Sequence, residues 1–104
     1  MTESLVEELL PIIEARNMLA RKAETTYAIQ VDDIIHKKCK DVRQIEWTLS
    51  CMLDFCFDDR VLTLYKKLCR YYYQIDPIAT ARYVYAYRDM WDDEYHQDQD
   101  GIPL

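Results

Sequence analysis

Glycine is almost absent from this sequence, and its scarcity constrains the fold more than any other feature. The chain of 104 residues contains one glycine and three prolines. Sandwiches and barrels of β-strands need many tight turns, in which glycine supplies backbone conformations that other residues avoid. Phosphate-binding loops and dinucleotide-binding turns need several glycines at fixed spacings. The sequence therefore excludes these nucleotide-binding motifs and favours an all-α fold.

The composition indicates a folded protein with one core. Half of the residues are hydrophobic and 31% are charged, which is too apolar for a disordered chain. A chain of this length forms one domain, so we expect residues 1–104 to be a single helical domain. Residues 95–104 are polar and contain the only glycine, which predicts a short, irregular and flexible acidic tail.

The sequence predicts a cytoplasmic protein with free thiols. The N-terminal residues are acidic and lack the basic start of a secretory signal. No apolar run approaches the roughly 20 residues that a membrane span needs, so we expect no membrane contact. Cysteines occur at positions 39, 51, 56 and 69 without a Cys-x-x-Cys pair. In a reducing compartment such cysteines stay reduced and pack as small hydrophobic residues.

Caps and apolar spacing predict four helices. The first spans about residues 5–38, with Pro11 either in its first turn or at a kink. The second spans about 41–56 and the third about 59–73, capped by Asp58. The fourth begins at Asp76-Pro77, a capping side chain followed by a proline at the first helical position, and runs to about Glu94. The short joints between the last three helices predict an antiparallel helical bundle.

The first helix is too long for the other three to cover. Its roughly 30 residues span about 45 Å, whereas a helix of 16 residues spans about 24 Å. Two explanations remain open. The helix breaks near Val31-Asp32-Asp33, which would give five helices, or its surplus length is covered by a second chain.

Residues suited to catalysis or cofactor binding are scarce. The two histidines do not stand beside a predicted nucleophile, and serine occurs only at positions 4 and 50. His36 and Cys39 share a helix face, but a zinc site needs four ligands, or three and a water. We therefore expect no catalytic residue, no metal, no cofactor and no enzymatic activity, and the sequence identifies no small-molecule ligand.

Tyrosines and arginines in the last two helices are the most distinctive feature. Seven of the nine tyrosines fall between Tyr65 and Tyr87, and they point in almost every direction around their helices. Some rings must then lie outside the core, and Tyr and Arg are typical of interface hot spots. The predicted interface residues are Tyr71, Tyr73, Tyr83, Tyr87, Arg82 and Arg88. We expect at least two of these four tyrosines to be exposed in the single chain or covered by a partner.

The last two helices are expected to pack as an antiparallel hairpin with apolar residues inside it. Leu64, Leu68, Ala81 and Val84 are expected to lie inside it. Tyr65 and Tyr72 are expected to be partly buried.

These features favour a small helical protein that acts through protein–protein contact, with a homodimer as the expected assembly. An alternative is an acidic inhibitor or regulator that binds a basic surface of another protein, for example as a mimic of nucleic acid. That alternative draws on the formal net charge of −6, which also argues against nucleic acid as a partner. A metal-binding or enzymatic protein is a further alternative with less support.

Overall fold

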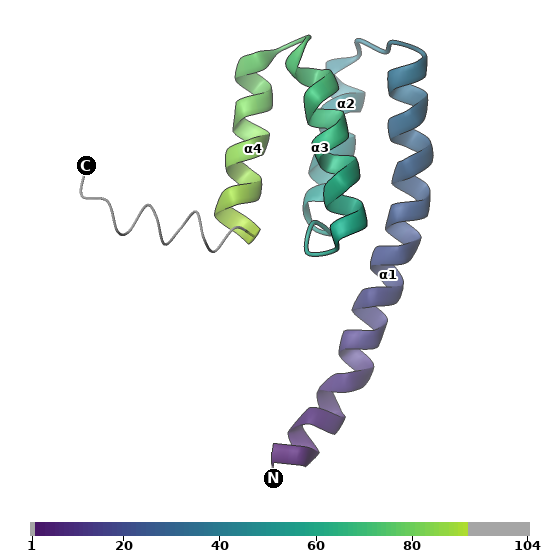
Figure 1. The fold of residues 1–104 in the computed structure, drawn as a ribbon, viewed down its shortest axis with the longest axis vertical. Coiled ribbons are helices and arrows are strands. Elements are labelled where there is room, and N and C mark those ends of the chain that lie inside the picture. Colours follow the sequence, from purple (N-terminus) through teal and green to yellow (C-terminus); the bar gives the residue numbers. More distant parts are fainter. Residues whose placement is uncertain (1, 92–104) are drawn as a thin grey trace, which may run out of the picture.

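The computed structural model describes residues 2–91, with side chains from residue 5 onward, and this part of the chain is all-α. It contains α1 (Thr2–His36), α2 (Val42–Leu53), α3 (Asp59–Tyr73) and α4 (Pro77–Trp91). Successive helices run in opposite directions (Figure 1). The predicted helical bundle is thus confirmed. The predicted tail at 95–104 and the extension of the fourth helix to Glu94 lie outside the described residues.

Aspartate caps fix the starts of the three shorter helices. The Asp41 carboxylate accepts hydrogen bonds from the backbone N–H groups of Arg43 and Gln44 at the start of α2. Asp58 caps α3 in the same way, and Asp76 accepts from Ala79 at the start of α4 at 3.0 Å. Each bond satisfies a backbone donor that has no partner within the helix. The prediction for the end of α2 was three residues too long, because the chain turns after Leu53.

The first helix is continuous through both positions at which the sequence suggested an interruption. Pro11 lies inside α1, and the predicted alternative of a break near Val31–Asp33 is wrong. Val31 and Ile34 are both buried against the bundle, so packing holds this segment in the helix. The helix ends at His36, after which Lys38 adopts a positive φ of 50°. The backbone N–H groups of Lys38 and Cys39 then donate to the carbonyls of Ile35 and Ile34, which is a Schellman motif.

The core is built around α3, which contacts each of the other three helices. Leu68 and Tyr72 are fully buried, and Tyr65 is 2% exposed. The prediction that Tyr65 and Tyr72 are only partly buried is therefore wrong. Ala81, predicted to lie inside the α3–α4 hairpin, is exposed, and Leu64 and Val84 are partly buried. α4 buries only Ala79 and Thr80, because it packs on one edge of the bundle.

The N-terminal half of α1 projects beyond the bundle. Figure 1 shows α1 continuing well past the ends of the other helices. The radius of gyration is 16.5 Å, against about 13 Å for a compact domain of 100 residues. The first residue of α1 to be buried is Ala20. We call residues 5–19 the α1 arm.

Candidate functional site

Four tyrosine hydroxyls connect different elements of the bundle. Tyr65 donates to the backbone carbonyl of Tyr83 in α4 at 2.6 Å. Tyr71 donates to the carbonyl of Cys39 in the α1–α2 connection, also at 2.6 Å. The remaining two lie against α2: Tyr72 donates to the Glu46 carboxylate, and the Tyr83 hydroxyl lies 3.3 Å from the Ser50 hydroxyl. Much of the tyrosine content thus fixes how the helices pack.

The six predicted interface residues are only partly available to a partner. Tyr73 is 61% exposed, and Arg82 and Arg88 are exposed, while Tyr71, Tyr83 and Tyr87 are partly buried. Fewer tyrosines are exposed than we expected, because Tyr71 and Tyr83 turn their hydroxyls toward other elements of the bundle. None of the four tyrosines is fully buried, so an interface role for this surface stays a prediction.

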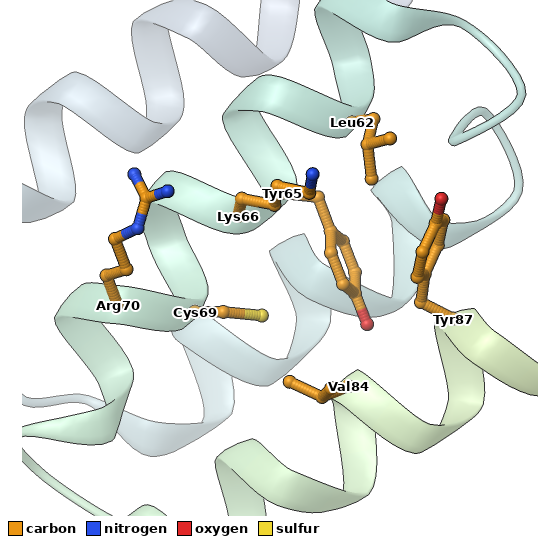
Figure 2. A pocket seen from close by; sticks show the side chains of 7 residues that line it. All are labelled: Leu62, Tyr65, Lys66, Cys69, Arg70, Val84 and Tyr87. Atoms are coloured by element: carbon orange, nitrogen blue, oxygen red, sulfur yellow. The ribbon is translucent and has the colours of Figure 1, made fainter. Parts of the chain in front are cut away.

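A shallow groove runs between α3 and α4. Figure 2 shows the rings of Tyr65 and Tyr87 in it, with ring centroids 6.2 Å apart. The groove has a volume of about 220 Å³ and is lined by Leu62, Tyr65, Lys66, Cys69, Arg70, Val84 and Tyr87. Its floor is apolar and its α3 rim is basic, so it suits an apolar group that carries negative charge.

The α1 arm carries the largest group of exposed apolar side chains in the described chain. Each of the eight is between 44% and 64% exposed. They are Leu5, Val6, Leu9, Leu10, Ile12, Ile13, Met18 and Leu19. Single exposed hydrophobic residues are ordinary, whereas groups of exposed apolar residues are typical of contact surfaces.

The arm's apolar surface continues the stripe by which α1 packs on the bundle. Ile13, Ala20, Tyr27 and Ile34 follow one another at intervals of seven residues, which places them on one face of a helix. Ala20 and Ile34 are buried, whereas Ile13 is half exposed. The surplus length of this helix was predicted, and Leu9, Ile12 and Leu19 belong to its helical apolar spacing, but no residue of the arm was among the predicted interface residues. The seven-residue spacing was the signal that could have found them.

An arginine and two aromatic rings fix the base of the arm. The Arg16 guanidinium lies 3.7 Å from the centroid of the Phe57 ring and 5.9 Å from that of Trp91. Phe57 and Trp91 pack with their centroids 5.8 Å apart, and the Trp91 indole N–H donates to the Leu53 carbonyl at 2.7 Å. These cation–π contacts connect α1 to the α2–α3 connection and to the end of α4, and they set the direction of the arm.

Acidic and basic side chains balance within residues 5–91. The sequence has 13 Lys and Arg residues and 19 Asp and Glu residues. Six acidic residues are Glu3 and five within 92–104, so residues 5–91 hold equal numbers of acidic and basic side chains. Some of them pair: Asp32 in α1 accepts from Lys67 in α3 at 2.9 Å. The Lys67 hydrogen bond and charge lower the pKa of Asp32.

The buried thiols are poor nucleophiles. Burial raises the pKa of the Cys56 and Cys69 thiols to about 12, so both stay protonated at neutral pH.

The side chains of Cys39 and His36 contact other groups of the chain. The Cys39 thiol lies 3.6 Å from the Gln44 side-chain oxygen, and the His36 ring lies 2.8 Å from the Asp32 carbonyl. Within the described residues, no group of three or more potential metal ligands comes together. None of the described helices is both long and apolar enough to cross a bilayer.

The raised thiol pKa values predict a loss of stability in alkali. An unfolded chain ionises its cysteines near pH 8.5, whereas the folded thiols ionise near pH 12. Stabilisation from this source is therefore fully present below pH 8.5 and falls as the pH rises. The expected loss in the free energy of unfolding is about 1 kcal/mol per thiol per pH unit.

Urea unfolding between pH 7 and pH 10.5 measures this loss. Cys56→Ala combined with Cys69→Ala should flatten the decline between pH 8.5 and pH 10, whatever its stability at pH 7. An equally steep decline in this double variant would show that other groups cause it.

Comparison with known proteins gives no relative from which a function could be inferred. No protein-family model matches the sequence, and no curated protein or solved structure matches it significantly.

Proposed function

We propose that this protein acts through protein–protein contact and that its first partner is a second copy of itself, bound through the α1 arm. The observation that carries the proposal is the arm's set of eight large apolar side chains, each about half exposed. Within the described side chains, burial along α1 begins at Ala20, and Arg16 at the base of the arm lies over the Phe57 ring.

The low intrinsic stability of the arm as an isolated helix favours a partner that packs against it. An isolated helix of about 15 residues is marginal in water, and most helices in proteins are stabilised by packing of an apolar face. Pro11 weakens this helix further, because it removes the hydrogen bond to the Glu7 carbonyl. A second chain packed along the arm would supply the missing stabilisation.

The size of the surface also suits a dimer. Eight half-exposed aliphatic side chains present on the order of 600 Å² of apolar area per copy. A stable interface buries about 800 Å² per partner. Flanking polar atoms of the same helix would provide much of the difference.

The acidic-regulator alternative has less support from the described residues. A protein that binds a basic surface needs an excess of carboxylates on one face. Residues 5–91 have no net excess of either sign, and two of their carboxylates, Asp32 and Asp33, pair with lysines. The surplus acidic residues lie outside this part of the chain.

Size-exclusion chromatography with multi-angle light scattering tests the proposal. At tens of micromolar the full chain should elute with about twice its monomer mass of 12.5 kDa. A mass that stays at the monomer value up to 100 µM would refute self-association.

A further inference from the structure

Charged residues divide the arm and its base into an acidic and a basic half. Residues 5–14 contain Glu7, Glu8 and Glu14 and no basic residue, whereas residues 15–22 contain Arg16, Arg21 and Lys22 and no acidic residue. Two such helices packed in parallel would place like charges together. In an antiparallel pair, acidic residues near the start of each arm come alongside the partner's Arg16.

Three apolar residues mark a line along which an antiparallel pair could form. Leu5, Ile12 and Leu19 are spaced by seven residues and lie on one face of α1. They are 57%, 64% and 56% exposed, so the line is open along its whole length. The spacing is symmetric about Ile12. A second copy in reverse orientation therefore brings its Leu19 opposite Leu5 and its Ile12 opposite Ile12.

We infer that two copies pair their α1 arms antiparallel about a two-fold axis near Ile12. This inference rests on the proposed self-association and specifies its geometry. Leu5 packs against the partner's Leu19 at each end, and Glu8 comes opposite the partner's Arg16. Burial of the apolar line supplies affinity. The pairing of Glu8 with the partner's Arg16 at each end favours the antiparallel orientation, because a parallel pair would place Glu8 beside Glu8 and Arg16 beside Arg16.

This arrangement places the two bundles at opposite ends of a central helix pair. Burial within each copy begins at Ala20, eight residues beyond the axis. The two Ala20 positions are therefore about 24 Å apart along the pair.

Disulfide crosslinking of the full chain distinguishes this geometry from others. In the antiparallel pair, Ile12→Cys lies opposite its own copy and should form a crosslinked dimer under mild oxidation. Leu5→Cys alone should not, because its two copies are about 21 Å apart and a disulfide needs Cα atoms within about 7 Å. Leu5→Cys mixed with Leu19→Cys should crosslink efficiently. All three positions are exposed, so the variants should fold, which far-UV circular dichroism checks.

Wild-type chain oxidised under the same conditions is the control, because it shows how much crosslinking its four native cysteines cause. Crosslinking of Leu5→Cys with itself at the efficiency of Ile12→Cys would show a parallel pair and overturn the inference, while self-association would stand. A dimer by light scattering without crosslinking at Ile12→Cys would show that the arm docks elsewhere, such as on the α3–α4 groove. A monomer by light scattering would refute both the inference and the proposed function.

Discussion

Leu68→Ala should lower the free energy of unfolding by about 2–5 kcal/mol. Leu68 is fully buried in α3, which packs against all three other helices. Removing its side chain loses the transfer free energy of the buried groups and leaves a cavity that close-packed neighbours fill only in part. Urea denaturation followed by circular dichroism measures the change.

Ile78→Ala is the matched control, because Ile78 is an aliphatic residue that is 73% exposed. It should cost less than about 1 kcal/mol, since surface substitutions leave no cavity. If the Leu68 variant were as stable as the Ile78 variant, α3 could not be the centre of the core. Both proteins should be compared at the same concentration, because self-association adds to the apparent stability.

Ile12→Asp should weaken dimerisation at least about 100-fold. Ile12 is 64% exposed in the single chain and lies at the proposed two-fold axis, so each dimer would contain the substitution twice. The two carboxylates would be removed from water, and they would also repel each other. Sedimentation equilibrium of the wild-type and variant chains gives the two dissociation constants.

Ile29→Asp provides the control for this experiment. Ile29 is on the same helix and is 68% exposed, but it lies outside the arm. Its substitution should change the dissociation constant by less than about threefold. An equal loss of affinity in both variants would mean that net charge, rather than the arm, controls association.

Local signals were enough to predict the helices of the bundle. Asp58 and the pair Asp76-Pro77 mark helix starts that the structure reproduces, because a capping bond depends only on neighbouring residues. The position of Leu68 in the core also followed from helical spacing. The start and end of α1 differ from prediction by two or three residues, since its end depends on a positive φ at Lys38.

The complete burial of Tyr65 and Tyr72 depends on contacts with residues that are distant in the sequence. Spacing places Tyr65 and Tyr72 on the apolar face of α3, but it does not reveal that hydrogen bonds to the Tyr83 carbonyl and the Glu46 carboxylate allow their complete burial. Those partners are distant in the sequence. Burial and the Tyr72–Glu46 hydrogen bond raise the pKa of Tyr72, and burial is the main reason for the raised pKa of Tyr65.

The surplus length of the first helix was predictable, but the choice between its two explanations was not. Residues 31–33 contain two adjacent aspartates, which would suit a break at the surface. Val31 and Ile34 remain in the helix because the bundle buries both. Whether packing outweighs a local preference depends on which elements meet there, and this is a property of the whole fold.

Hydrogen–deuterium exchange of the arm, measured at two protein concentrations, tests most directly whether a second copy covers it. Without a partner, the amides of residues 5–19 belong to a marginal helix and exchange rapidly. These amides should exchange at least about tenfold more slowly at 100 µM than at 1 µM, while the amides of α3 exchange at the same rate at both concentrations. Equal, rapid exchange of the arm at both concentrations would contradict the proposed self-association.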